Sequence, residues 1–184
     1  SSNTVRGSLS LGKNVDAICA DLKLHIGFLY SNGLTLNQGE ITKFSTQSWN
    51  ISPSVSSDIT KWLIIKYNAD YRQSLQVISE EKKPMIHNFR QNITTSIIPI
   101  KTLILSLSFN HYYNSALSVN TKSSWFGNIG LKYIMKKVEI MIDWTNIFNT
   151  RQFITSSYSN VMSYYAQYVM RPTEVLLRVK FKLL

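Results

Sequence analysis

Apolar and polar side chains alternate along most of the chain, and the alternation is clearest near its C-terminal end. Between Glu174 and Leu184 every second position is apolar, and these positions are Val175, Leu177, Val179, Phe181 and Leu183. The remaining positions are mostly charged, namely Glu174, Arg178, Lys180 and Lys182, with Leu176 as the exception. A strand places two such sets on opposite faces, whereas a helix would mix them around its surface. The pattern therefore predicts a β-strand with one apolar and one basic face.

Eight further segments show the same period of two. The plainest are residues 18–30, 61–72, 101–113 and 137–148, and the weaker ones are residues 5–12, 41–51, 85–98 and 124–134. One more strand inside residues 150–168 would raise the count to ten. Most of these segments span ten residues or more, whereas strands of soluble proteins average about 5–6 residues. Transmembrane barrel strands need roughly 9–11 residues, so strand length favours the wall of a barrel.

The connections alternate in character along the chain. Residues 99–101 and 135–137 form very short turns, and residues 12–17 and 53–60 form somewhat longer ones. Between them lie polar connections at residues 31–40, 79–84, 114–122 and 149–163. Short turns at one end and longer loops at the other are typical of bacterial outer-membrane barrels. The sequence thus predicts an all-β fold of about nine or ten antiparallel, up-and-down transmembrane β-barrel strands.

A soluble sandwich is the alternative fold. It predicts that Leu103, Leu105 and Leu107 pack against a second sheet, whereas in a barrel they face lipid. Aromatic residues gather near the predicted strand ends, as expected of rings at a water–lipid boundary. They are Tyr30, Tyr71, Tyr112, Tyr113, Trp125, Tyr133, Trp144, Phe148, Tyr164, Tyr165, Tyr168 and Phe181. No apolar run approaches the 18 residues of a membrane-spanning helix, so a membrane role would require strands.

Composition changes this picture only a little. Charged residues make up 16% of the chain, below the roughly 25% of a typical soluble domain. The net charge is +10, but the basic residues are dispersed, so no nucleic-acid partner is predicted. The three histidines, His25, His87 and His111, show no metal-binding spacing, and no GxSxG motif occurs. The sequence predicts no catalytic, cofactor or metal site, and therefore not an enzyme; an outer-membrane enzyme would need a Ser–His–acid cluster at the rim.

Two groups of side chains are candidates for contacts. Glu139 and Asp143 share one face of their predicted strand, so they are expected to meet Arg178 and Lys180 of the next strand as cross-strand pairs. Four tyrosines of the last predicted loop are weak candidates for ligand binding by stacking on sugars, and they are Tyr158, Tyr164, Tyr165 and Tyr168. They could equally border a membrane, and this interpretation is slightly preferred.

The end of the chain is similar to one protein family. The segment Asp143-Trp-Thr-Asn-Ile-Phe-Asn-Thr150 resembles the N-L-F-N element on the penultimate strand of TonB-dependent receptors. The segment from Met170-Arg171-Pro172 to Leu183 resembles the closing strand of the Bacteroidetes type of these outer-membrane receptors. The chain departs from the family at its end, where Leu184 replaces the usual aromatic residue and Phe181 stands three positions earlier. The plug domain and the TonB box of the family are not present.

The resemblance implies that residues 1–184 are the C-terminal segment of a 22-stranded barrel in the bacterial outer membrane. It implies a role as barrel wall in nutrient uptake, without a cofactor. The implied partners are outer-membrane lipid, the remaining barrel and plug, the TonB complex through the N-terminal region that is not present, and a surface lipoprotein. The alternative is a small complete barrel that acts as a binding or adhesion protein. Pairing between the first and last strands would distinguish the two.

Overall fold

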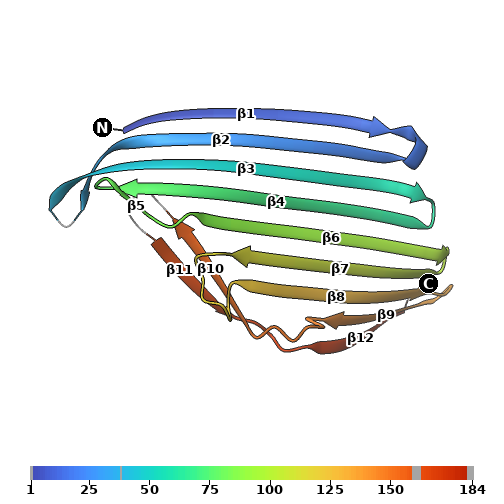
Figure 1. Ribbon diagram of the computed structural model, residues 1–184. Coiled ribbons are helices and arrows are strands. Elements are labelled where there is room, and N and C mark those ends of the chain that lie inside the picture. The colour runs from blue at the N-terminus through green and yellow to red at the C-terminus, as the bar shows by residue number, and fades with distance from the viewer. Residues whose placement is uncertain (1, 38, 159–162, 182–184) are drawn as a thin grey trace.

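The computed structural model describes residues 2–37, 39–158 and 163–181, and nearly all of them lie in strands (Figure 1). The strands are β1 (Ser2–Val15), β2 (Ala20–Asn37), β3 (Glu40–Thr60), β4 (Leu63–Ile78), β5 (Glu81–Lys82), β6 (Ile86–Ile100), β7 (Leu103–Asn114), β8 (Ser123–Ile134), β9 (Val138–Thr145), β10 (Gln152–Tyr158), β11 (Ser163–Val169) and β12 (Glu174–Phe181). One 3-10 turn, η1 (Asp16–Ile18), joins β1 to β2. No described helix is long and apolar enough to cross a membrane.

Nine of these strands form a single antiparallel path. Their order is β1-β2-β3-β4-β6-β7-β8-β9-β12, and β5 pairs only with β4. The prediction of nine antiparallel, up-and-down strands is confirmed, because each predicted segment corresponds to one strand of this path. The strand suspected within residues 150–168 is a separate two-stranded hairpin of β10 and β11. In the described part of the chain β1 and β12 do not pair with each other, so the sheet is open and is not a closed barrel.

Two predicted connections were wrong, because strands continue through them. Residues 53–60 belong to β3, and the turn to β4 is only Lys61 and Trp62. Residues 31–37 belong to β2 and pair with β3 as far as Asn37↔Glu40. Backbone ladders need no apolar alternation, so these Ser-, Thr- and Asn-rich stretches gave no strand signal. Pro53 fits inside β3 because the β3–β4 ladder skips Ser52 and Pro53, and proline has no N–H to donate there.

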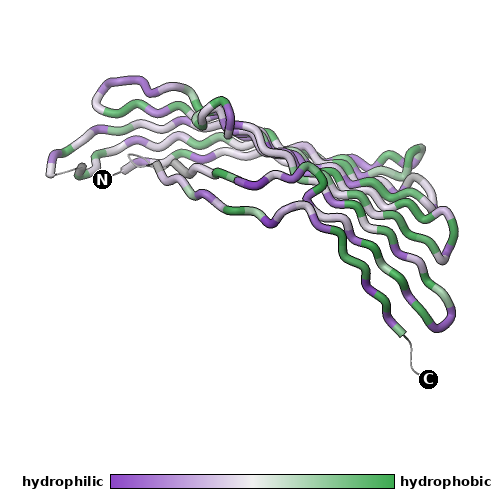
Figure 2. The backbone as a smooth tube through the Cα atoms, turned by 90° about the horizontal axis from the view of Figure 1, so that it is seen from below, coloured by the Kyte–Doolittle hydropathy of each residue, from purple (hydrophilic) through white to green (hydrophobic). Residues whose placement is uncertain are grey.

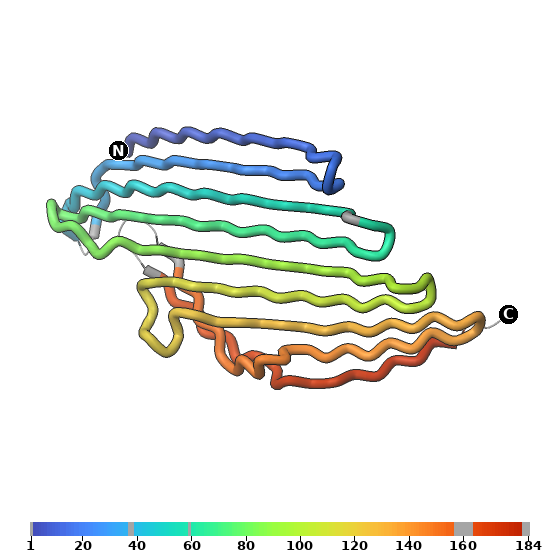
Figure 3. Tube along the Cα trace, turned by 45° about the vertical axis from the view of Figure 1, so that its right-hand side comes forward, coloured from blue at the N-terminus to red at the C-terminus, as the bar shows by residue number. Residues whose placement is uncertain are grey.

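The connections alternate between the two ends of the sheet (Figure 3). Residues 16–19, 61–62, 101–102 and 135–137 form the short turns at one end. At the other end lie the β4–β6, β7–β8 and β9–β12 connections, of which the last spans residues 146–173 and contains the β10–β11 hairpin. The predicted layout is confirmed except for β2–β3, which the extension of both strands reduces to residues 38–39.

The ladder registers divide the side chains of the path into two faces. Partners in an antiparallel ladder point to the same side, so the pairs Leu177↔Ile142, Ile142↔Leu131 and Leu131↔Leu105 join one apolar face across four strands. The same face continues to β1 through Leu105↔Ile97, Ile97↔Leu63, Tyr67↔Val55, Val55↔Leu22 and Leu24↔Leu11. We call it the apolar face, and we call the opposite side the polar face.

The sheet is one curved layer, with hydrophobic residues concentrated in its short-turn half (Figure 2). Only four hydrophobic residues are buried among those described, and they are Ala20, Phe44, Ala69 and Ile86. The sandwich alternative is not observed, since the described residues place no second sheet over Leu103, Leu105 and Leu107. The fold therefore has a complete backbone ladder but almost no internal core.

Candidate functional site

The apolar face forms a continuous band without charge. On β4 the band runs from Leu63 to Tyr71, which is about 27 Å at ~3.4 Å per residue. Only two Lys, Arg, Asp or Glu side chains of the nine-strand path lie on this face by register, Lys13 near the turns and Lys43 near the β2–β3 tip. Large side chains on the band are open to their surroundings, with Leu177 66% and Phe181 71% exposed.

Polar and aromatic groups border the band on the loop side. Tyr71 Oη lies 2.8 Å from His87 Nδ1, and Tyr67 Oη donates to Gln91 Oε1 at 3.1 Å. His111 continues this network, because its ring lies 2.9 Å from Ser123 Oγ and stacks on Trp125 with ring centroids 4.0 Å apart. Of the aromatics predicted at strand ends, Tyr30, Tyr71, Tyr113, Trp125, Tyr133, Trp144 and Phe181 lie on the apolar face, whereas Tyr112 lies on the polar face.

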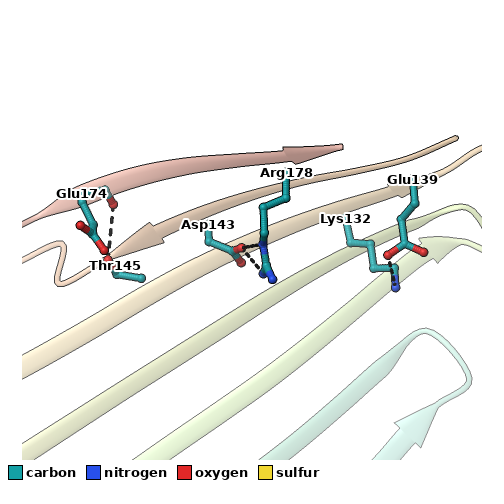
Figure 4. Close-up of polar contacts among 6 residues, drawn as sticks. All are labelled: Lys132, Glu139, Asp143, Thr145, Glu174 and Arg178. Atoms are coloured by element: carbon teal, nitrogen blue, oxygen red, sulfur yellow. Dashed lines mark hydrogen bonds and ion pairs between the residues drawn. The ribbon is translucent and has the colours of Figure 1, made fainter. Parts of the chain in front are cut away.

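The polar face carries ion pairs near the C-terminal strands (Figure 4). Arg178 Nη2 lies 2.5 Å from Asp143 Oδ2, which confirms the predicted pair across β12 and β9. Glu139 was predicted to meet the next strand, but its ion pair, at 2.9 Å, is with Lys132 on β8. Lys180 stands directly opposite Glu139 in the ladder. The charges of these three strands thus largely satisfy one another within the sheet.

The Asn-Ile-Phe-Asn segment fastens the base of the last loop. Asn146 adopts a left-handed φ of 50° and donates through Nδ2 to Thr150 O at 2.9 Å and to Arg171 O at 2.8 Å. Its Oδ1 accepts from Thr150 N at 3.0 Å, and Asn149 Oδ1 accepts from Thr173 N at 3.2 Å. The two ends of the loop are therefore tied together by side chains of this segment.

Gly127 allows the same segment to approach β8 closely. A Cβ at this position would lie 2.8 Å from Phe148 Cε2 and 2.9 Å from Ile147 Cγ1. Ile147 N donates to Gly127 O at 2.9 Å, so the contact also involves the backbone. Phe148 packs against Phe109 and Trp125, with ring centroids 6.2 and 6.4 Å apart. This position requires a residue without a side chain.

The β10–β11 hairpin packs against the polar face. The Phe153 ring lies 4.9 Å from Tyr112 and 5.6 Å from Phe126, and both of these side chains point to the polar side of β7 and β8. Asn114 Nδ2 donates to Ser156 Oγ, which connects the hairpin to the end of β7. The hairpin is thus placed over the loop half of the sheet.

A cavity of about 500 Å³ lies between the hairpin and strands β4, β6 and β7, and we call it the hairpin cavity. Arg72, Arg90 and Lys122 line it, together with Asp70, Tyr112 and Phe153. None of the three cations forms an ion pair within the described part of the chain. Asp70, the acidic residue of the lining, accepts a 2.7 Å hydrogen bond from Ser52 Oγ.

Of these lining residues, Tyr112 was predicted as an aromatic near a strand end, and no pattern pointed to the cations or to Phe153. Arg72 and Arg90 lie at polar-face positions of strands that were expected, but their proximity depends on the β4–β6 register, which pairs Arg72 with Asn88 and Asp70 with Arg90. Phe153 comes from a hairpin that was not predicted. For the two arginines, the only signal in the sequence was that a basic residue alternates with apolar residues along its strand.

The predicted ligand-binding tyrosines lie on the hairpin, outside the nine-strand path. Tyr164, Tyr165 and Tyr168 of β11 are 59%, 60% and 52% exposed. Tyr168 stacks near Phe153 with centroids 6.3 Å apart, and Tyr164 and Tyr165 point to opposite faces of their strand. The side chain of Tyr158 lies outside the described residues. A role for these tyrosines in binding sugars or in bordering a membrane stays a prediction.

The remaining titratable groups are dispersed. His25 lies on the polar face with Nδ1 2.9 Å from Ser10 Oγ. Among the described residues, no three His, Cys, Asp or Glu side chains come together in an arrangement that could hold a metal ion. No known family, no curated protein and no solved structure matches the chain. The case for a function therefore rests on the chemistry of the two faces.

Proposed function

We propose that the chain forms part of the wall of a transmembrane β-barrel in the bacterial outer membrane, within a receptor of the TonB-dependent class that takes up nutrients. One observation carries the proposal, namely that the nine-strand path places charged side chains almost entirely on its polar face. Lys13 and Lys43 are the exceptions by register, and both lie near the ends of their strands. A charge facing lipid at the bilayer midplane costs about 2–4 kcal/mol, so a lipid-facing surface must exclude it.

The size of the apolar face argues for lipid as its neighbour. Nine strands spaced roughly 4.8 Å apart, with a band about 27 Å long, give a surface on the order of 1,000 Å². The largest apolar patch of a typical soluble monomer is about 300–600 Å². The aromatic residues at both borders of the band, such as Tyr71 and Tyr133, suit a boundary between lipid and water.

The polar face fits the lumen of such a barrel. Side chains of barrel strands alternate between lipid and lumen, and the ion pairs of Asp143 and Lys132 lie on the side opposite the apolar band. By the same layout the short turns face the periplasm and the longer loops face the outside. Among the described residues, the edge strands β1 and β12 each leave one side without a partner, and unpaired edges are unfavourable in lipid. Further barrel strands, up to 22 in all, would pair with these edges.

The receptor class is proposed from the loop base and the closing strand. Asn146 and Asn149 tie the ends of the last loop together, which gives a structural reason for an Asn-rich element at the end of a penultimate strand. A receptor of this class would also supply a plug, an N-terminal contact to the TonB complex and a surface lipoprotein partner. The alternative of a small complete barrel would need a β1–β12 ladder, which the described residues do not form.

The proposal is tested by mapping the two faces in the full-length gene product. Cys19 is the only cysteine of the chain, so a Cys19→Ser background accepts single cysteines at Leu105 on the apolar face and at Ser106 on the polar face. In outer-membrane vesicles, Ser106→Cys should react with a small water-soluble maleimide, whereas Leu105→Cys should stay unreactive, because a thiol that faces lipid does not ionise to the reactive thiolate. Equal reactivity of the two positions, or a protein that stays in the supernatant without detergent, would overturn the proposal.

A further inference from the structure

We propose that the hairpin cavity binds an anionic ligand that carries a planar ring. In this arrangement Arg72, Arg90 and Lys122 hold the anion, and Tyr112 and Phe153 hold the ring. The inference deepens the proposed function by naming a ligand class, and it rests on that function only in placing the cavity inside a lumen.

The charges of the cavity point to an anion. Three basic side chains line it and Asp70 is the one acidic residue of that lining, so the lining carries a net positive charge. Asp70 stands opposite Arg90 in the ladder, yet the two form no ion pair within 4 Å. Asp70 is instead engaged by Ser52. The guanidinium groups of Arg72 and Arg90 remain available, and their fork geometry suits carboxylate or phosphate.

The C-terminal strands of the polar face use their cations differently. Arg178 and Lys132 have carboxylate partners at 2.5 and 2.9 Å on the same face. No described carboxylate reaches Arg72 or Arg90 in this way, although both are exposed on the polar face. Arg72 and Arg90 are diagonal neighbours in the β4–β6 ladder, so a single bound anion can lie near both of them. The loop half of the polar face is therefore suited to a charge that comes from outside the chain.

The aromatic side of the cavity adds the second requirement. Tyr112 and Phe153 have ring centroids 4.9 Å apart at an interplanar angle of 57°, and Phe126 lies 5.6 Å from Phe153. Such tilted clusters can extend to a further ring at centroid distances of about 4.5–7 Å. A volume of about 500 Å³ is within the size of small-molecule sites, roughly 300–1,000 Å³. A ligand with a ring beside its anionic group would fill both parts.

The test uses phenyl phosphate as the probe. The full-length gene product in detergent is titrated by calorimetry with phenyl phosphate, inorganic phosphate and benzyl alcohol. Phenyl phosphate should bind more tightly than either inorganic phosphate, which lacks the ring, or benzyl alcohol, which lacks the charge. Replacing both arginines, Arg72→Gln with Arg90→Gln, should weaken phenyl phosphate binding at least about tenfold, because the charged hydrogen bonds to the phosphate are lost. Phe153→Leu should weaken phenyl phosphate and leave inorganic phosphate unchanged.

A matched control separates the cavity from the general charge of the face. Arg6→Gln removes an exposed arginine of the polar face on β1, outside the cavity lining, and should leave phenyl phosphate binding unchanged. The inference is overturned if wild type does not bind phenyl phosphate at millimolar concentration, if benzyl alcohol binds as tightly, or if Arg6→Gln weakens binding as much as the double variant. The maleimide mapping of Leu105 and Ser106 is repeated on the same preparations, so a failure of binding with correct mapping contradicts the ligand site alone.

Discussion

The short-turn half and the loop half of the sheet share the same strands but arrange their polar groups differently. In the short-turn half the apolar face carries no charge between Lys13 and the aromatic border, and the carboxylates of the C-terminal strands have basic partners. In the loop half the same face carries Gln91, His87 and His111 in hydrogen bonds. On the polar face of this half, Arg72 and Arg90 form no ion pair with any described residue. A single strand such as β7 passes through both patterns.

In the short-turn half the side chains stabilise the sheet, and in the loop half we propose that some of them contact other molecules. Within the short-turn half, the alternation of apolar and polar residues along each strand is enough to predict on which face each side chain lies. Beyond the border both faces become polar, and the arrangement depends on loops that fold back over the sheet. Four sets of variants test this difference between the short-turn half and the loop half, in order of decreasing expected effect on stability.

The largest effect is expected from a charge on the apolar face of the short-turn half. Leu105→Arg should lower the free energy of unfolding in vesicles by about 2–4 kcal/mol, because an arginine at mid-depth in lipid is strongly unfavourable. Urea unfolding in vesicles measures the change. Two controls should each cost less than about 1 kcal/mol, namely Ser106→Arg at the same depth on the polar face and Gln73→Arg on the apolar face in the loop half. Equal losses for all three would contradict the difference between the two halves.

A smaller loss is expected at the junction between the two halves. Gly127→Ala places a methyl group within 3 Å of Ile147 and Phe148, and overpacking of this kind costs about 1–3 kcal/mol. The same urea unfolding experiment measures it. Gly7→Ala is the matched control, since nothing lies within 4 Å of a Cβ at that position. If Gly127→Ala left the free energy of unfolding unchanged, Ile147 and Phe148 would not pack against Gly127 as described.

The ion pair of the C-terminal strands should contribute modestly. Asp143→Asn removes the charge that Arg178 contacts, and the side chains are 32% and 59% exposed. Exposed pairs of this kind typically contribute 0.2–1 kcal/mol, so a loss of about this size is expected. A double-mutant cycle with Arg178→Gln isolates the coupling. A coupling free energy of zero would mean that the ion pair of Asp143 and Arg178 does not stabilise the sheet.

Arg72→Gln should leave stability unchanged within about 0.5 kcal/mol. The side chain is exposed and has no partner among the described residues, so its removal breaks no contact of the sheet. Thermal unfolding of the detergent-solubilised protein measures the effect. A loss comparable to that of Asp143→Asn would show that Arg72 has a structural partner, and it would weaken the assignment of Arg72 to a ligand.

Alternation predicted much of the fold, because a sheet with one apolar face leaves a period of two in each strand. All nine path strands were expected, as were the faces of β12 and the pairing of Asp143 with Arg178. The strand extensions at residues 31–37 and 53–60 were missed, since they contain few apolar residues, namely Leu34 and Leu36 in the first and Val55 and Ile59 in the second, among many Ser, Thr and Asn residues. One further strand was considered within residues 150–168, whereas the structure has two strands, β10 and β11, which pair with each other and not with the nine-strand path.

The hairpin cavity could not be predicted, because its residues come from separate parts of the chain. Arg72 and Arg90 meet only through the β4–β6 register, and Phe153 reaches them only because the last loop folds over the polar face. Neither the register nor the direction of that loop leaves a periodic signal. The exposed tyrosines of β11 were more conspicuous in sequence than the cations that line the cavity.

The hydrogen bonds that Asn146 donates to Thr150 and Arg171 hold together the two ends of the loop that contains the β10–β11 hairpin. Because the two ends of this loop are held a few ångströms from one another, residues 151–170 can change in length or composition without altering the distance that β9 and β12 must bridge. Longer loops add little closure entropy, roughly 0.6 kcal/mol for each doubling of length. Exchange of the hairpin sequence would therefore leave the β9–β12 ladder in place, and under our proposal it would change the rings that border the hairpin cavity.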